Sequence, residues 1–220
     1  MKGPVPALAT EMNLAGVQGK ASVTRVKIGF FGGSFDPVHF GHLCAAQDAC
    51  EQHRLDRLFF VPAAQAPLKP HDAQSSAGDR LAMLRAATGQ DPRFEISDYE
   101  LQKGGVSYTI DSVRYFLAQF PDDRLFWIIG GDQRPRLHLW KDVHELVRLI
   151  EFIVLERPGQ PGPAGPAFPG LRLHSCAGHS MEISSTELRE RARRGLPLDY
   201  FVPHKTVVYI KEMGLYRQSG

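Results

Sequence analysis

Short apolar segments of strand length alternate with segments of helical periodicity along most of the chain, and this alternation constrains the fold more than any other feature. The strand-length segments are apolar at consecutive positions, which indicates strands buried on both faces. We therefore predict an α/β fold: a doubly wound, Rossmann-like parallel sheet with helices on both faces. The predicted strands cover residues 26–31, 57–62, 94–97, 125–129 and 152–155, with a short sixth strand at 171–174. Predicted helices cover residues 41–53, 79–88 and 142–149, and a further helix carries the apolar stripe Ile110, Val113, Leu117 and Phe120.

Residues 25–217 are predicted to form one domain, which ends in a small helical part at residues 184–217. Residues 1–24 are predicted to be a flexible leader, because their scattered Gly, Pro and Ala residues lack the apolar run of a signal peptide. Residues 158–170 are rich in Pro and Gly and are expected to form a surface linker.

The overall charge and the cysteines limit the partners and the compartment. The formal net charge is only +2, so no basic field selects for nucleic acid. No apolar run is long enough to span a membrane. Cys44, Cys50 and Cys176 form no C-x-x-C pair, which favours a reducing cytoplasm. The oligomeric state is left open, and a homo-oligomer is one option.

The strongest local signal lies between the first predicted strand and the first predicted helix. It reads Gly32-Gly33-Ser34-Phe35-Asp36-Pro37-Val38-His39-Phe40-Gly41-His42. Glycines let the backbone approach a ligand closely, and Asp-Pro is typical of a turn. His39 and His42 are three residues apart at a helix N-terminus, where backbone N–H groups and the helix dipole favour phosphate. Two imidazoles there can donate hydrogen bonds to phosphate oxygens as charge grows on a leaving pyrophosphate.

Two simpler interpretations of the histidine pair exist: it caps a helix, or it is half of a metal site. Zinc needs two or more further ligands, and no Cys/His cluster stands close to the pair in sequence. The glycines and the Asp-Pro turn at fixed spacing favour the phosphate site, so we predict no protein-held metal here.

A second candidate anion site reads Ile183-Ser184-Ser185-Thr186-Glu187-Leu188-Arg189. Ser184 and Glu187 have the spacing of a capping box, which predicts a helix that starts at Ser184. Ser185 and Arg189 then share a face, so a hydroxyl, a guanidinium and backbone N–H groups converge at the helix start. Taken alone, the segment is more typical of a plain capped surface helix.

The first motif resembles the signature of the nucleotidyltransferase superfamily that contains the H-x-G-H adenylyl- and cytidylyltransferases. The segment I-S-S-T-x-x-R is similar to the second ATP-phosphate motif of that superfamily. The resemblance implies that both segments bind ATP. The residues that it assigns to ATP are Gly32, Gly33, Ser34, Phe35, His39, Gly41, His42, Gly130, Asp132, Ile183, Ser184, Ser185, Thr186 and Arg189.

From about residue 26 to Gly214-Leu215-Tyr216-Arg217 the chain resembles bacterial nicotinic acid mononucleotide adenylyltransferases. The resemblance implies that Trp140 stacks on the pyridine ring of the mononucleotide. It also implies that Tyr108 and Thr109 hold the nicotinate end. Further stretches that carry the resemblance are V-P-A-A-Q-A-P-L-K-P at 61–70, Ser107-Tyr108-Thr109, Ile129-Gly130-Gly131-Asp132 and Glu156-Arg157-Pro158-Gly159. The full set assigned to the mononucleotide is Asp36, Lys69, Tyr108, Thr109, Trp140 and Arg157.

One stretch departs from the family pattern. The family usually has Pro-Pro-His followed by Lys or Arg after the second strand, and this chain has Ala66-Pro67-Leu68-Lys69. Lys69 keeps its positive charge, but the role of the missing His is absent or supplied elsewhere. We do not assign that role to His71.

The resemblance implies that the 5′-phosphate of the mononucleotide attacks the α-phosphorus of ATP and expels pyrophosphate. The nucleophile is already an anion near neutral pH, so positioning and charge neutralisation can supply the catalysis. The residues expected to supply them are His39, His42, Lys69 and Arg189. Mg²⁺ is expected to arrive with ATP and to keep most of its waters, without an all-protein carboxylate cage.

Four other functions are alternatives to this one. Phosphopantetheine adenylyltransferases have both phosphate motifs but do not explain the Ser-Tyr-Thr segment together with Trp140. A cytidylyltransferase is a further option. A nucleotide sensor without turnover is disfavoured because both histidines and Arg189 are intact. A dinucleotide-dependent oxidoreductase is disfavoured because G-x-G-x-x-G is absent after the first strand.

Overall fold

The computed structural model describes residues 25–68, 73–89, 91–156, 165–179 and 181–217. The predicted leader and residues 158–164 of the predicted linker lie outside the described residues.

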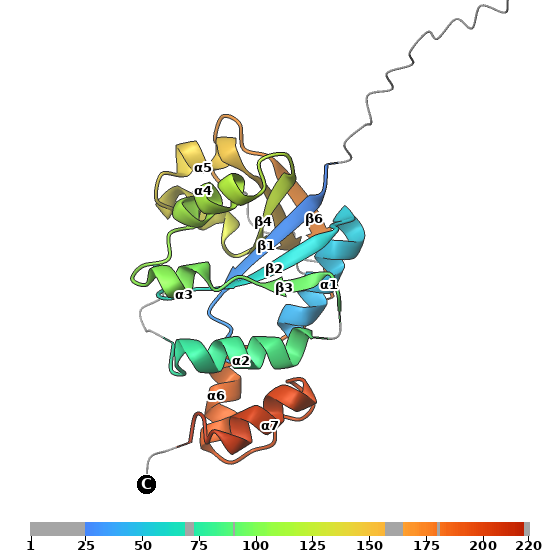
Figure 1. The fold of residues 1–220 in the computed structure, drawn as a ribbon, viewed down its shortest axis with the longest axis vertical. Coiled ribbons are helices and arrows are strands. Elements are labelled where there is room, and N and C mark those ends of the chain that lie inside the picture. Colours follow the sequence, from blue (N-terminus) through green and yellow to red (C-terminus); the bar gives the residue numbers. More distant parts are fainter. Residues whose placement is uncertain (1–24, 69–72, 90, 157–164, 180, 218–220) are drawn as a thin grey trace, which may run out of the picture.

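Six strands form one sheet in the order β3-β2-β1-β4-β5-β6, and every neighbouring pair is parallel (Figure 1). The predicted doubly wound parallel sheet is therefore confirmed. The strands are β1 (Lys27–Gly33), β2 (Arg57–Pro62), β3 (Phe94–Ile96), β4 (Arg124–Gly130), β5 (Glu151–Glu156) and β6 (Leu173–Ala177). The helices are α1 (Phe40–His53), α2 (Ala77–Thr88), α3 (Tyr99–Lys103), α4 (Thr109–Gln119), the 3₁₀ helix η1 (Arg134–Leu139), α5 (Val143–Leu149), α6 (Ser185–Arg193) and α7 (His204–Glu212).

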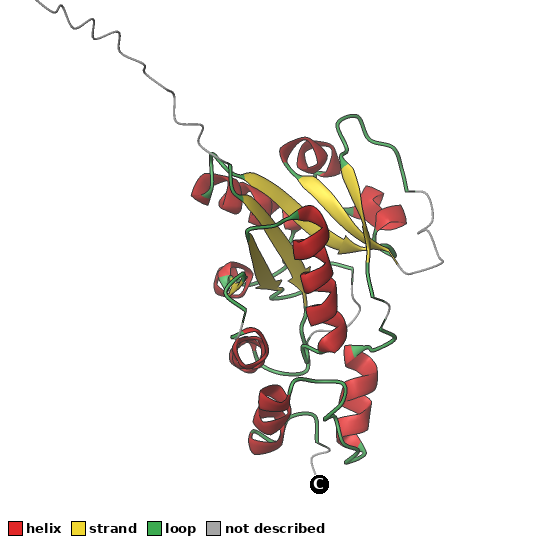
Figure 2. Ribbon diagram, turned by 90° about the vertical axis from the view of Figure 1, so that its right-hand side faces the viewer, coloured by secondary structure: helices red, strands yellow, loops and turns green. Residues whose placement is uncertain are grey.

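The strands are apolar at consecutive positions because each face of the sheet has its own core. On β1, Phe30 packs with residues of α4 and α5, whereas Phe31 belongs to the core built by α1, α2 and the C-terminal helices. Figure 2 shows the sheet with helices on both sides. Burial of both faces is what a parallel sheet requires.

Strands β1 and β4 lie side by side at the centre of the sheet. The chain passes from β1 to β2 on one side and from β4 to β5 on the other, so the connections diverge above this pair. A crevice forms at the carboxyl ends of strands where the winding direction changes. The strand ends there are Gly33 and Gly130.

Some boundaries differ from the prediction. The sequence predicts a strand at 171–174, but β6 spans Leu173–Ala177 because pairing with β5 sets its register, with Leu173 opposite Phe152. The short helices α3 and η1 are not predicted. Five or six residues are too few to show a helical period.

The two predicted C-terminal helical segments are α6 and α7, and they pack below α2 in the view of Figure 1. Backbone and side-chain hydrogen bonds join this part to the rest of the protein. The Phe40 N–H at the start of α1 donates to the Phe201 carbonyl at 3.0 Å. The Thr206 hydroxyl donates to the Met83 carbonyl on α2 at 3.3 Å. The C-terminal helices thus contact the elements that begin beside the crevice.

Arg80 on α2 ties together the loops that follow β1 and β2. Its side chain is buried, and its Nη1 donates to the Ser34 carbonyl at 3.1 Å and to the Ala63 carbonyl at 2.6 Å.

We expect Arg80→Met to lower the free energy of unfolding by about 2–3 kcal/mol, because two carbonyls lose a charged donor. Urea denaturation measures the change. The exposed Arg85 on the same helix supplies the control: Arg85→Met should change stability by less than about 0.5 kcal/mol. Equal effects of the two variants would contradict a role for Arg80 in the loops.

Candidate functional site

A cavity of about 420 Å³ opens at the carboxyl ends of β1 and β4, where the winding direction changes. Its wall combines backbone from the first motif with side chains from the segments before α4 and after β4. Eight of the predicted site residues line it: Gly32, Gly33, Ser34, Tyr108, Thr109, Gly130, Asp132 and Trp140. Candidate contacts from four separate segments of the sequence therefore lie on one continuous surface.

The glycines of the first motif lie where a side chain would crowd neighbouring rings. A Cβ atom at Gly32 would be 3.0 Å from Cζ2 of Trp127, which forms part of the cavity wall. A Cβ atom at Gly33 would be 2.9 Å from Cζ of Phe35. The backbone of β1 therefore reaches the cavity with aromatic rings packed closely against it.

The two histidines of the motif lie against each other at the start of α1. Their rings are stacked, with centroids 3.7 Å apart and an interplanar angle of 29°. His39 is the N-cap residue, and its backbone N–H donates to Nδ1 of His42 at 3.3 Å. A Cβ atom at Gly41 would lie 3.0 Å from Nδ1 of His39, so the glycine between the histidines gives the first ring its space.

Burial determines the charge of His39. The His39 side chain is almost fully buried, and burial lowers its pKa from 6.5 to about 4. His39 is therefore a neutral imidazole at pH 7 in the protein without ligand. A neutral imidazole still has one N–H to donate to a phosphate oxygen.

Helix α6 brings the second motif against the first. Ser184 is its N-cap residue and accepts a hydrogen bond from the Glu187 N–H at 3.2 Å, as the sequence predicts. The Ser185 hydroxyl donates to the Pro37 carbonyl at 2.9 Å. Arg189 donates from Nη1 to the Asp36 carbonyl at 2.7 Å. The predicted second anion site thus lies directly beside the turn that leads into the histidine pair.

The Arg189 guanidinium is only partly used by these contacts. Its Nη2 donates to the Thr186 hydroxyl at 3.2 Å. Its buried Nε has no hydrogen-bond partner among the described residues. A guanidinium with donor capacity at a helix start is suited to an anion with several oxygens.

Aromatic and cationic side chains form the other end of the cavity. Trp140 is partly buried, packs edge-to-face on Phe152 with centroids 6.3 Å apart, and also lines the cavity. The Lys141 ammonium lies 4.6 Å from the centroid of the Tyr108 ring and 3.7 Å from a carboxylate oxygen of Asp111. This end thus offers an aromatic surface and a cation at the same wall.

A buried carboxyl group also reaches this wall. Glu100 accepts a hydrogen bond from the Ser112 hydroxyl at 2.5 Å, and burial raises the pKa of the Glu100 carboxyl. Ser107, one residue before Tyr108, is a further hydrogen-bond partner of Glu100 and accepts from the Ala64 N–H at 2.9 Å. Glu100 therefore holds the segment that enters α4.

Several predicted residues do not line the cavity. Asp36, predicted to bind the mononucleotide, is 2% exposed, and its carboxylate is occupied by protein donors. This geometry gives no support to a substrate contact by the Asp36 side chain. Phe35 is also buried in the core. Lys69 and Arg157 lie outside the described residues. Other predicted residues away from the cavity wall are His39, Gly41, His42, Ile183, Ser184, Ser185, Thr186 and Arg189, which form or adjoin the neighbouring anion site.

Sequence reasoning missed four polar residues of the cavity wall: Glu100, Gln133, Arg136 and Lys141. Lys141 is adjacent to Trp140, and this adjacency is a signal that could have found it. Arg136 lies on η1, which is too short to predict. Glu100 is separated from its partner Ser112 by a turn and a change of helix, so spacing alone does not connect them.

The described residues contain no group of three or more His, Cys, Asp or Glu side chains that could hold a metal ion. Among the same residues, no helix has both the length and the apolar character needed to cross a membrane.

Comparison with known proteins gives three agreeing results. Residues 30–191 match the family model described as cytidylyltransferase-like. A protein of Opitutus terrae named as a probable nicotinate-nucleotide adenylyltransferase is 70% identical over 88% of this chain and 100% of its own length. A protein of Methylacidiphilum infernorum with the same name is 39% identical over 88% of this chain and 93% of its own length.

A solved structure supports the fold. The nicotinic acid mononucleotide adenylyltransferase of Plasmodium falciparum, complexed with NaAD, superposes with a TM-score of 0.70 over 87% of this chain and 98% of its own. The sequences are only 20% identical. This match therefore concerns the Rossmann-like architecture.

Burial of His39 predicts a pH-dependent stability. The unfolded chain binds a proton at this imidazole below about pH 6.5, and the folded protein binds it only below about pH 4. Stability is therefore lost as pH falls from 6.5 towards 4, by roughly 2 kcal/mol at pH 5. Urea denaturation at pH 7.5 and pH 5 should show a smaller loss in His39→Gln than in the wild type. Substitution of the exposed His204 by Gln is the control. Parallel pH dependences of wild type and His39→Gln would contradict a neutral buried imidazole.

Proposed function

The chain belongs to the nicotinate-nucleotide adenylyltransferases of the cytidylyltransferase-like family, and we infer that it transfers the AMP moiety of ATP to nicotinic acid mononucleotide. The products are nicotinic acid adenine dinucleotide, an intermediate of NAD biosynthesis, and pyrophosphate. The observation that carries this function is the 70% identity over the full length of the Opitutus terrae protein. The two ends of the site support it with chemistry suited to the two substrates.

At the anion site, we assign His39, His42 and Arg189 to the phosphates of ATP. The nucleophile is the anionic 5′-phosphate of the mononucleotide, so no strong general base is required. The α-phosphorus must be held in line with the incoming oxygen while negative charge moves onto pyrophosphate. Imidazole N–H donors, the guanidinium and the start of α1 stabilise that charge without rearrangement. The contacts of Arg189 with Asp36 and Thr186 support this assignment because they hold the guanidinium beside the histidines.

The remaining ATP contacts are proposed from the cavity wall and the second motif. The backbone of Gly32, Gly33 and Ser34 lines the cavity beside Gly130 and Asp132, which supports a role in holding the nucleotide. The start of α6 at Ser185 is suited to the outer phosphates, since helix N-termini attract anions.

At the other end, we assign Trp140, Tyr108 and Thr109 to the nicotinate group. A flat, electron-poor ring is stabilised by an aromatic surface such as Trp140. Thr109 opens α4, whose first turn has backbone N–H groups without helical partners, and these favour a carboxylate. The Lys141 ammonium adds positive charge at the same wall. These features support the acid mononucleotide over the amide, although Lys141 also faces Asp111.

Three further assignments complete the proposal. Lys69 and Arg157 are proposed to contact phosphates of the substrates, on the strength of the family resemblance alone. Mg²⁺ is proposed to enter with ATP as part of the substrate, where it neutralises triphosphate charge. The cytoplasm is proposed as the compartment, which the three free thiols Cys44, Cys50 and Cys176 support.

The direct test of function is pyrophosphate release from ATP with three acceptors in parallel. We expect turnover with nicotinic acid mononucleotide, less with nicotinamide mononucleotide, and none with phosphopantetheine. His42→Ala should lower kcat by roughly a hundredfold or more, because it removes a donor aimed at developing charge. That variant also controls for a contaminating activity. Wild-type turnover with phosphopantetheine alone would reject the function.

Trp140 allows a separate test of the pyridine end. Trp140→Ala should raise KM for the mononucleotide about tenfold and leave KM for ATP nearly unchanged, because only the ring loses its stacking partner. Steady-state kinetics with a thermal melt separates binding from folding, since Trp140 also packs on Phe152. Tyr200→Ala, which truncates an aromatic side chain that is 91% exposed, is the control. A destabilised Trp140→Ala protein with unchanged KM for the mononucleotide would exclude stacking.

A further inference from the structure

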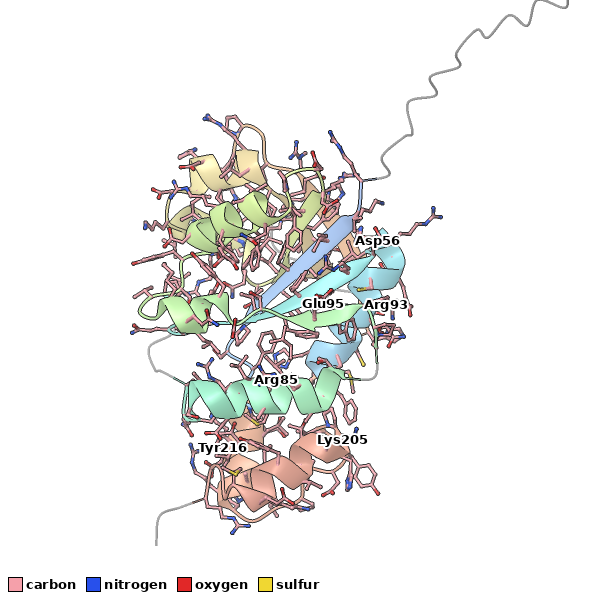
Figure 3. The ribbon with its side chains drawn as sticks, viewed as in Figure 1. Asp56, Arg85, Arg93, Glu95, Lys205 and Tyr216 are labelled. Carbon is pink, nitrogen blue, oxygen red and sulfur yellow. The ribbon has the colours of Figure 1, made fainter. Side chains whose placement is uncertain are left out.

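The last turn of the described chain brings a tyrosine into the core behind the first motif. Tyr216 is 9% exposed and lies next to α2, where its hydroxyl is 3.8 Å from the Met83 sulfur (Figure 3). The chain reaches this position through two left-handed residues, Gly214 with φ of 62° and Tyr216 itself with φ of 63°. A left-handed conformation is unfavourable for a bulky residue, so contacts of the tyrosine must offset it.

The contact that holds Tyr216 is a hydrogen bond to a buried carboxylate. Its hydroxyl donates to Oδ1 of Asp36 at 2.6 Å. Two further groups donate hydrogen bonds to the same carboxylate. The Gln74 N–H donates to Oδ2 at 2.6 Å, and the Ser75 hydroxyl donates to Oδ1. Burial, together with the neighbouring Asp36 carboxylate, raises the pKa of Tyr216, so the phenol keeps its proton and acts as the donor.

The same Asp36 residue contacts the anion site through its backbone. Its carbonyl accepts the hydrogen bond from Nη1 of Arg189, and the next carbonyl, of Pro37, accepts from Ser185. Two residues later the chain reaches His39. Any rotation of the Asp36 peptide would therefore move Arg189 and the histidine pair together.

We propose that Tyr216 is a positioning residue, which orients Arg189 and the His39–His42 pair through its hydrogen bond to the buried Asp36 carboxylate. The inference rests on the proposed function and extends it, because it makes the far end of the chain part of the phosphate-handling machinery. Tyr216 itself does not touch the substrate cavity.

The chain supplies a matched control for this hydroxyl. Tyr209 on α7 also donates to a carboxylate, Oδ1 of Asp79, at 2.9 Å. That bond joins α7 of the C-terminal part to α2 and does not involve the first motif. Tyr209→Phe therefore removes a phenol–carboxylate hydrogen bond from the same interface without disturbing Asp36.

The experiment compares Tyr216→Phe and Tyr209→Phe with wild type in the pyrophosphate-release assay with ATP and nicotinic acid mononucleotide. We expect Tyr216→Phe to lower kcat about tenfold with KM for the mononucleotide unchanged within a factor of about two, because misplaced donors weaken transition-state binding. Tyr209→Phe should keep wild-type kcat. Tyr216→Phe should lower the thermal midpoint more than Tyr209→Phe, because the bond of Tyr216 is buried and that of Tyr209 is only partly buried. The kinetics of all variants are therefore measured well below the lower midpoint.

A double-mutant cycle separates positioning from a merely structural role. If Tyr216 acts through Asp36 on Arg189, the two substitutions disturb the same contact. The double variant Tyr216→Phe/Arg189→Ala should then lose less kcat than the two single fold-losses multiplied together. In the control double variant Tyr209→Phe/Arg189→Ala, the fold-loss in kcat should equal the product of the two single fold-losses. If Tyr216→Phe does not fold, Ser75→Ala removes another donor from the same carboxylate and should give the same kcat loss and the same coupling to Arg189.

Equal kcat values for Tyr216→Phe and Tyr209→Phe, or independent effects with Arg189→Ala, would overturn the inference. A wild-type protein that releases no pyrophosphate with these substrates would instead reject the proposed function. The two failures are therefore distinguishable in one set of assays.

Discussion

Strand β1 is hydrogen-bonded to β2 on one side and to β4 on the other, and both neighbours run parallel to it. Parallel strands cannot be joined by a tight turn, so a connection between them must cross a face of the sheet, usually as a helix. The connection from β1 carries α1 on one face, and the chain enters β4 from α4 on the other. The loops that follow β1 and β4 therefore diverge, and the space between them is the cavity. The position of the site therefore depends on the pairing of β1 with β2 and β4.

The electrostatics of the anion site follow from how deeply each group is buried. His39 is deeply buried and neutral at pH 7, so it does not repel the Arg189 guanidinium in the protein without ligand. Arg189 and the starts of α1 and α6 then carry the fixed positive character of the site. The carboxylate of Asp36 is buried, accepts hydrogen bonds from protein donors and does not line the cavity. The Asp36 charge thus lies behind the anion site, whereas the carboxyl groups of Glu100 and Asp132 line the neighbouring cavity.

The sequence is sufficient for those parts of the fold and site that depend on local patterns. The strands, the main helices and the Ser184 cap follow from periodicity and spacing, and the glycines of the first motif lie where close packing requires them. Contacts between distant segments are not encoded in any local pattern. Tyr216 and Asp36 are 180 residues apart, and Arg80 lies 46 residues from Ser34. For Asp36, the family resemblance implies a ligand contact, whereas the burial of its carboxylate and the donors around it depend on distant segments that no local pattern shows.

The replacement of the family's histidine by Leu68 changes which loops can supply charge to the mononucleotide. Leu68 lines the cavity beside Ala66 and Pro67, so the described part of the loop after β2 presents an apolar wall. The cationic side chains on the described wall, Arg136 and Lys141, both follow β4. A phosphate or carboxylate in the cavity would therefore be attracted towards the β4 side, where Trp140 also lies. The loss of one polar residue after β2 is compatible with binding of the mononucleotide. The wall that follows β4 carries both the aromatic surface of Trp140 and the positive charge of Arg136 and Lys141.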